Sequence, residues 1–247
     1  MTDARRCRSR RLSANSRQRA VTGRIARHTS ASMGVGVVAS ASVNADGTGA
    51  PTKRRMLALH GKGGNARAFA RQLAPLCDAT SEHWEWHFAD GGTIEPNPGG
   101  RGWWALRPGE RTFNASELPG VEDSIAMVRE TGPWAGIFGF SQGAMLAALV
   151  MAEDPSCVTE CAIIAGAAWP TCVAHKLERM ENGQMDVTPT RSLHIIGASD
   201  AINPPEQALR VARAFGLSAS VLNHDGGHIV PMDEKSMEQY VQFINAS

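Results

Sequence analysis

The chain has 247 residues, of which 43% are hydrophobic and 20% are charged, which suits one globular domain with residues left over for an appendage. Its formal net charge of +1 hides an asymmetry, because residues 1–50 hold nine arginines and only two acidic residues, which leaves the rest of the chain mildly acidic. An acidic body argues against nucleic acid and anionic membranes as partners, and no run approaches the roughly 18 apolar residues of a transmembrane helix.

Residues 1–30 are rich in Arg, Ser and Ala and poor in acidic residues. This composition is typical of an organellar transit peptide, for a plastid or a mitochondrion. Two other interpretations stay open. Residues 1–30 are a basic tail without a targeting signal in a cytoplasmic protein, or the protein begins at Met33. Residues 33–52 have the small, polar composition of a linker. We therefore expect a disordered leader and linker over residues 1–52 and a folded domain over residues 53–247.

Apolar runs of strand length follow in chain order at residues 54–61, 84–90, 134–140, 160–166, 192–198 and 218–224. Helix signals lie between and after them, at residues 65–77, 121–131, 144–152, 203–216 and 237–244. Asn65 and Asn203 are the expected N-caps of two of these helices. Continuously apolar strands that alternate with helices predict an α/β domain, with a mostly parallel sheet of about six strands covered by helices on both faces.

The sequence GFSQG, residues 139–143, lies where a predicted strand ends and a buried helix begins. A nucleophile elbow needs this context, because glycines on either side let strand and helix approach each other around a sharp turn that exposes the serine hydroxyl. The alternative is a glycine-rich turn in which Ser141 only caps the helix. The strand–turn–helix context favours Ser141 as a nucleophile.

A serine nucleophile needs a base, and the base needs an orienting acid. In α/β-hydrolases the acid and then the histidine follow the serine along the chain. Asp200 follows the next-to-last predicted strand, and His228 follows the last one after two glycines. His224 and Asp225 are alternatives, but they lie at the strand end, before the glycine pair. His194 lies inside a strand and is expected to be a core residue.

Two backbone amides are expected to bind the oxyanion that such chemistry forms. One belongs to Gln142, directly after the serine, and the other to Lys62, in the glycine-rich loop after the first strand. This loop lacks the G-x-x-x-x-G-K-[ST] pattern of a P-loop, so nucleotide binding is not expected. His60 is expected to brace the loop rather than to move protons.

Trp103 and Trp104 lie in a long segment without periodicity, residues 91–118. A connection of this length inside a compact domain is usually functional or mobile. The two indoles either cover the edge of the sheet or form the wall of a substrate pocket beside Ser141.

Five cysteines, an odd number at irregular spacing, indicate reduced thiols in an intracellular protein. Cys157 and Cys161 have no matching Cys/His pair nearby, so no metal is expected, and the chemistry needs no cofactor.

Five blocks together, LALHGKGGNARAF, RGWW, GIFGFSQGAMLAAL, IIGASDAINP and GGHIVP, resemble the FSH family of serine hydrolases over residues 54–245. The resemblance implies a compact α/β-hydrolase with little cap, a Ser-Asp-His triad at Ser141, Asp200 and His228, and carboxylesterase activity. Two departures concern the pocket rather than the triad. Lys62-Gly63-Gly64-Asn65 stands where the family usually has an aromatic residue followed by Gln-Asn, and Asn203-Pro204 replaces the usual Val-Pro.

The sequence therefore predicts a serine esterase that acts on a small-molecule ester through an acyl-enzyme. Two alternatives remain. One is a thioesterase of the acyl-protein thioesterase and carboxylesterase group, which shares GFSQG. The other is a non-catalytic α/β-hydrolase that binds a hydrophobic ligand or a partner. Acyl chain length, the physiological substrate and the oligomeric state do not follow from the sequence.

Overall fold

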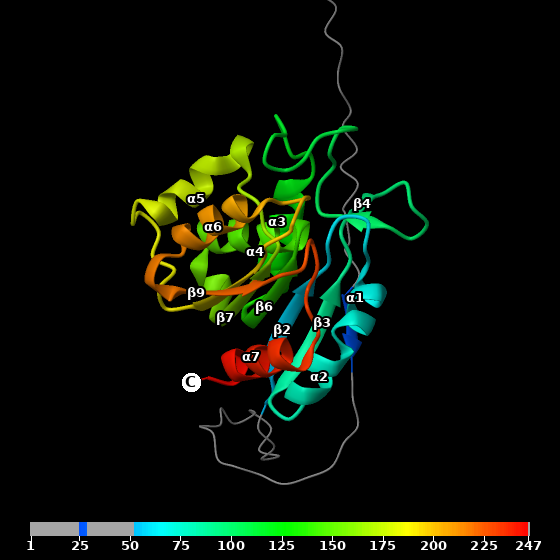
Figure 1. Ribbon diagram of the computed structural model, residues 1–247, viewed down its shortest axis with the longest axis vertical. Helices are drawn as coiled ribbons and strands as arrows, with labels where there is room; N and C mark the ends of the chain where they lie inside the picture. The colour runs from blue at the N-terminus through cyan, green and yellow to red at the C-terminus, as the bar shows by residue number, and fades with distance from the viewer. Residues whose placement is uncertain (1–24, 29–51, 247) are drawn as a thin grey trace, which may run out of the picture.

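A twisted seven-stranded sheet forms the centre of the computed structural model, which describes residues 25–28, as backbone, and residues 52–246 (Figure 1). The strand order is β1-β3-β2-β6-β7-β8-β9, and every pair is parallel except β1 with β3. The strands of this sheet are β1 (Ile25–His28), β2 (Arg54–Leu59), β3 (Trp84–Ala89), β6 (Trp134–Phe140), β7 (Val158–Ala165), β8 (Arg191–Gly197) and β9 (Ala219–His224).

Each of the six parallel strands coincides with a predicted apolar run, with ends that differ by two residues at most. The predicted α/β architecture, with a mostly parallel sheet of about six strands, is thereby confirmed. The runs are apolar throughout because helices cover both faces of the sheet, so that neither face of a central strand meets water. In β6, for example, Ile137 and Phe138 point to opposite faces and both are fully buried.

Helices pack on both faces of the sheet: α1, α2 and α7 on one, and α3, α4, α5 and α6 on the other (Figure 1). Their bounds are α1 (Ala66–Gln72), α2 (Ala74–Thr80), α3 (Val121–Thr131), α4 (Gln142–Glu153), α5 (Ala174–Glu181), α6 (Pro205–Ala214) and α7 (Glu234–Asn245). Short 3₁₀ turns cover Pro155–Cys157, Thr171–Val173 and Gly216–Ser218. The side chains of α4 are buried on every side from Gln142 to Ala152, as its uniformly apolar sequence predicts.

The helix predictions were wrong at three places. The helix expected over residues 65–77 is two helices, which meet at Leu73, the residue that begins the turn into Pro75. Asn203 does not cap α6, because Pro204 holds the cap position and the Asn203 side chain binds elsewhere. Helix α5 was not predicted, because its two buried residues, Leu177 and Met180, make too short a pattern to detect.

The expectation of a leader without ordered elements is corrected at residues 25–28, which form strand β1. This strand pairs antiparallel with β3, from Ile25 opposite Ala89 to His28 opposite Trp86. Without it β3 would be an edge strand with a row of unpaired backbone groups, and pairing satisfies them. The other residues of the predicted leader and transit peptide, 1–24 and 29–51, lie outside the described residues.

The long segment between β3 and α3 contains a small antiparallel hairpin, β4 (Thr93–Ile94) with β5 (Arg101–Gly102), and turns. A backbone bridge from Gly64 to Arg101 attaches this hairpin to the loop that follows β2. The segment therefore lies against the carboxyl end of the sheet, where predicted site residues also lie. None of the helices in the described part of the chain combines the length and the apolar character that a bilayer crossing requires.

Candidate active site

Ser141 lies in a sharp turn between the end of β6 and the start of α4, with φ 54° and ψ −116°. It is the only non-glycine residue with positive φ in the described part of the chain. Strain of this kind amounts to about 1–3 kcal/mol and persists only where the surroundings impose it. A Cβ at Gly139 would lie 2.4 Å from the Gly143 carbonyl oxygen, and one at Gly143 would lie 2.2 Å from the Leu59 oxygen. The two glycines therefore permit the close crossing that forces the serine outward.

His228 and Asp200, which follow β9 and β8, meet at this serine. His228 Nε2 lies 2.8 Å from Ser141 Oγ, and His228 Nδ1 lies 2.7 Å from Asp200 Oδ2. A carboxylate only accepts, so Nδ1 carries the proton and Nε2 is free to accept from the serine hydroxyl. The three predicted residues thus form one hydrogen-bonded chain, although they are far apart in the sequence.

Asp200 is held rigidly, and its side chain is only 2% exposed. Its second oxygen, Oδ1, accepts hydrogen bonds from the backbone N–H groups of Ile202, at 2.9 Å, and Asn203, at 2.8 Å. These bonds direct Oδ2 toward the imidazole. The arrangement fixes both the orientation and the tautomer of His228.

The His228 ring fits between Phe140 and Gly166. The Phe140 ring centroid lies 4.9 Å from that of His228, and a Cβ on Gly166 would come within 3.2 Å of His228 Cε1. Asn203 Nδ2 donates to the Gly166 carbonyl at 2.7 Å. The Asn203 side chain therefore joins the loop that carries Asp200 to the loop beside His228, a role that the sequence pattern did not reveal.

The alternative residues occupy other places. The Asp225 carbonyl accepts from Ser199 Oγ at 3.0 Å, and His224 Nε2 is buried without a hydrogen-bond partner among the described residues. His194 is 1% exposed inside β8, and burial lowers its pKa to about 3. Neither His224 nor His194 contacts Ser141 through any hydrogen bond found in the described chain.

A cleft of about 990 Å³ opens beside Ser141 and His228. Lys62 and Gln142 line it on one side, and exposed apolar side chains of Ile94 and Ile202 lie along it. Further wall comes from residues 105–112. This volume is at the upper end of the range of small-molecule sites.

The pocket-wall interpretation of Trp103 and Trp104 does not agree with the structure. The two side chains are 1% and 0% exposed, they belong to the apolar core, and neither lines the cleft. The physical reason is that large aromatic rings gain most free energy by complete removal from water, which an open cleft does not provide.

Lys62 and Gln142, the two residues whose amides are predicted to bind an oxyanion, both line the cleft. Gln142 is the first residue of α4, where a backbone N–H has no acceptor one turn earlier. Lys62 lies in the turn after β2, and its ammonium group binds Glu95 Oε2 at 2.6 Å. Glu95 is almost buried, with a side chain 7% exposed, and no motif had singled it out.

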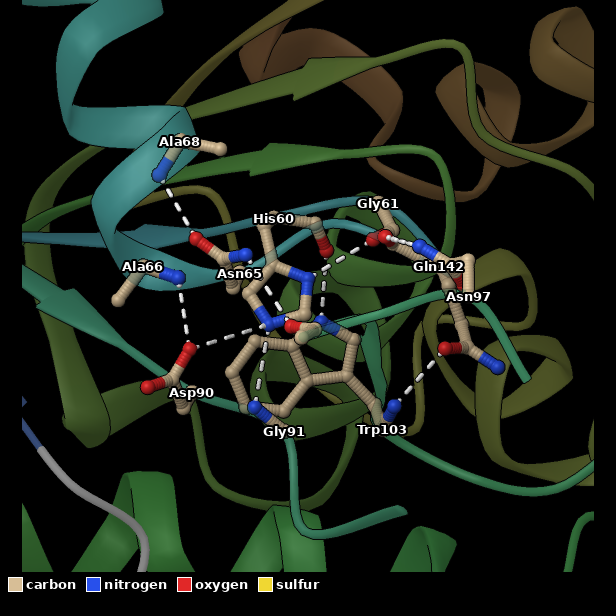
Figure 2. A network of polar contacts seen from close by, with 12 residues as sticks. His60, Gly61, Asn65, Ala66, Ala68, Asp90, Gly91, Asn97, Trp103 and Gln142 are labelled. Carbon is tan, nitrogen blue, oxygen red and sulfur yellow. Dashed lines mark hydrogen bonds and ion pairs between the residues drawn. The ribbon is translucent and has the colours of Figure 1, made fainter. Parts of the chain in front are cut away.

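Hydrogen bonds of the buried His60 side chain hold the loop after β2 (Figure 2). His60 Nε2 accepts from the Gly91 amide at 3.1 Å, so Nδ1 is the protonated nitrogen, and it donates to the Gly61 oxygen at 2.8 Å. Burial is the largest cause of a His60 pKa below the ordinary value of 6.5. These contacts suit the expected bracing role of His60.

Cysteine chemistry is remote from this site. Burial raises the pKa of Cys77 and of Cys161 to about 12, which keeps both thiols protonated and unreactive. Within residues 25–28 and 52–246, no group of three or more His, Cys, Asp or Glu side chains is arranged to hold a metal ion.

The family model described as "Serine hydrolase (FSH1)" matches residues 50–240. Esterase OVCA2 of Danio rerio is 34% identical over 157 residues, which cover 58% of this chain and 67% of that protein. Esterase OVCA2 of Homo sapiens is 31% identical over 170 residues, which cover 64% of this chain and 73% of the relative.

Solved structures share the fold. The crystal structure of esterase PE8 superposes with a TM-score of 0.61 at 20% identity, covering 78% of this chain and 91% of that one. The Bacillus cereus carboxylesterase gives a TM-score of 0.56 at 17% identity, covering 78% of this chain and 88% of its own.

Proposed function

We propose, from the premise that this chain belongs to the serine hydrolase (FSH1) family, that it cleaves carboxylic esters with Ser141, His228 and Asp200 as its catalytic triad. The observation that carries the proposal is the chain of two short hydrogen bonds, 2.8 Å from His228 to Ser141 and 2.7 Å from His228 to Asp200. The names of the two esterase relatives support an ester substrate. The open cleft beside the serine supports a small molecule.

In the first half-reaction His228 Nε2 takes the proton of the Ser141 hydroxyl while Oγ attacks the ester carbonyl carbon. The carbonyl oxygen becomes an oxyanion, which accepts hydrogen bonds from the backbone amides of Lys62 and Gln142. Asp200 stabilises the imidazolium through Nδ1. When the tetrahedral intermediate collapses, the alkoxy group leaves with the proton from His228, and the acyl group stays on Ser141.

In the second half-reaction a water molecule replaces the alcohol. His228 removes a proton from the water as its oxygen attacks the acyl carbon, and the same two amides bind the second oxyanion. Ser141 then leaves with the proton that His228 holds, and the carboxylic acid is released. No step needs a metal or a redox cofactor.

The test compares Ser141→Ala with the wild-type full-length chain on p-nitrophenyl esters from acetyl to palmitoyl. We expect kcat to fall by more than about 1,000-fold because the nucleophile is lost. A fluorophosphonate probe should label the wild-type protein at Ser141 and leave the variant unlabelled. Ser81→Ala is the matched control, since Ser81 is half-buried away from the cleft and its hydroxyl donates to the Asp78 carbonyl at 2.8 Å.

Two outcomes would contradict the proposal. Full hydrolysis by Ser141→Ala would exclude this serine as the nucleophile. A wild-type protein that neither hydrolyses any chain length nor reacts with the probe would instead be a binding module. Thioesters of the same acyl groups, measured in parallel, decide between esterase and thioesterase by the ratio of kcat/KM values.

A further inference from the structure

Trp103 connects the two segments that carry the proposed oxyanion amides (Figure 2). Its backbone N–H donates to Gln142 Oε1 at 2.8 Å, and its indole Nε1–H donates to the His60 carbonyl at 2.7 Å. The side chain is 1% exposed, so neither bond competes with water. Trp103 thus joins the start of α4 to the end of β2.

The bond from the Trp103 indole holds the His60 carbonyl, which belongs to the His60–Gly61 peptide. This is the first of two consecutive peptide units that lead to the Lys62 N–H. The His60 carbonyl oxygen is also close to the elbow, since a Cβ on Gly143 would lie 2.7 Å from it. The His60 ring packs against the Trp103 ring with centroids 4.9 Å apart. Both the carbonyl and the imidazole of His60 are therefore positioned by Trp103.

The second peptide unit contains the Gly61 carbonyl and the Lys62 N–H. This unit is planar and trans, so the two groups point in opposite directions, and fixing one fixes the other. The Gly61 oxygen accepts from His60 Nδ1 at 2.8 Å and from the Gly64 amide at 2.9 Å. These two bonds determine where the Lys62 N–H points.

We infer that Trp103 is a positioning residue of the oxyanion hole. One continuous set of contacts runs from the Gln142 side chain through Trp103 and His60 to the Gly61–Lys62 peptide, and it sets the spacing and direction of the two amides. Trp103 touches no substrate in this role. The inference rests on the proposed function, because only an oxyanion needs both amides to converge.

The adjacent tryptophan offers a matched control. Trp104 is 0% exposed, but its indole Nε1–H has no hydrogen-bond partner within the described chain. Only the Trp104 backbone contacts this set of residues, since its carbonyl accepts a hydrogen bond from Gln142 Nε2 at 2.9 Å. Replacing either tryptophan with phenylalanine removes an indole N–H and similar volume, but only Trp103→Phe breaks a bond to the oxyanion loop.

The experiment compares Trp103→Phe and Trp104→Phe in the full-length chain, on the p-nitrophenyl ester that the wild type cleaves best. We expect Trp103→Phe to lower kcat at least about tenfold, because small misplacements of catalytic donors have large effects on rate. KM should change less than about twofold. Trp104→Phe should keep kcat within about twofold of the wild type.

Two further readouts separate positioning from loss of fold. An alkyl trifluoromethyl ketone, which forms an oxyanion on the serine, should bind Trp103→Phe more weakly by the same factor as kcat falls. The carboxylic acid product, which forms no tetrahedral oxyanion, should bind as in the wild type. The pH midpoint of kcat should stay unchanged, because the contacts of His228 are intact.

The inference is overturned if Trp103→Phe keeps wild-type kcat and ketone affinity, or if both phenylalanine variants lose activity equally. Should Trp103→Phe lack a cooperative unfolding transition, Gln142→Met decides. It keeps the side-chain volume and removes both bonds of the Gln142 side chain, to the Trp103 amide and to the Trp104 carbonyl. Unchanged kcat in that variant overturns the inference. Failure of the proposed function looks different, because the wild type itself would then show neither turnover nor labelling at Ser141.

Discussion

Ser141 combines the position of the proposed nucleophile with a strained backbone, φ 54° and ψ −116°. Any side chain with a Cβ is disfavoured in this conformation, so the strain persists in Ser141→Ala. The turn keeps it because strand β6, helix α4 and their two glycines leave the chain no other path. At this residue backbone strain lowers the stability of the fold, and the same conformation exposes the hydroxyl group.

Replacing Ser141 with glycine tests whether the backbone at this residue is strained. Ser141→Gly should be about 1 kcal/mol more stable to urea than Ser141→Ala, since glycine adopts positive φ without strain. Its greater entropy in the unfolded chain offsets part of the gain. Equal urea midpoints for the two variants would show that the conformation is not strained here.

At the scale of secondary structure, β8 carries a buried titratable group that the proposed mechanism does not use. His194 is 1% exposed, its ring packs 4.9 Å from that of Phe215, and its Nε2 lies 3.1 Å from Ser192 Oγ. Burial lowers its pKa from 6.5 to about 3, so the folded strand holds the neutral ring. The unfolded chain has no such restriction.

This difference predicts a pH dependence of stability. Between about pH 6.5 and 3 the unfolded state binds the His194 proton and the folded state does not, so stability falls as pH falls. The slope from this one group is at most about 1.4 kcal/mol per pH unit. His194→Leu should flatten the profile of unfolding free energy against pH in that window, while His83→Leu, at a side chain 42% exposed, should not. Parallel profiles for His194→Leu and the wild type would contradict this account.

The helices show how local signals compete. Proline and an asparagine cap predicted α6 as a helix, yet Asn203 binds the Gly166 carbonyl instead of the helix terminus. An asparagine side chain can accept from a helix N–H through Oδ1 or donate to a carbonyl through Nδ2, and the outcome depends on which loop lies beside it. Sequence alone does not contain that information.

At the scale of the whole molecule, two apolar core clusters lie on opposite faces of the sheet, and all their members come after residue 55. Strand β1 pairs with β3 through its backbone at the edge of the sheet. Both apolar clusters of the described residues therefore form within the part of the chain that follows the leader.

Removing residues 1–52 should leave a protein that unfolds in one cooperative transition. The β3 amides that pair with β1 should then exchange with solvent faster, because the edge becomes exposed. Amides of β9, on the opposite edge, serve as the internal control and should exchange at the same rate in both proteins. Unchanged exchange in β3 would mean that β1 does not protect this edge.

The sequence by itself determined the features that depend on neighbouring residues: six apolar strands, the alternation with helices, the Gly-x-Ser-x-Gly turn, and the order in which Ser141, Asp200 and His228 follow their strands. Each strand and the Gly-x-Ser-x-Gly turn is encoded by neighbouring residues, and their order follows from the chain. The parallel sheet then brings the carboxyl ends of β6, β8 and β9 to the same side.

Only the tertiary structure decided the contacts between segments far apart in the chain. Trp103 binds His60 rather than lining the cleft, Lys62 pairs with Glu95, and β1 completes the β3 edge. A buried indole and a pocket indole have the same local sequence pattern. At Trp103 the indole Nε1–H donates to the distant His60 carbonyl at 2.7 Å. That distance exists only once the sheet and its loops have assembled.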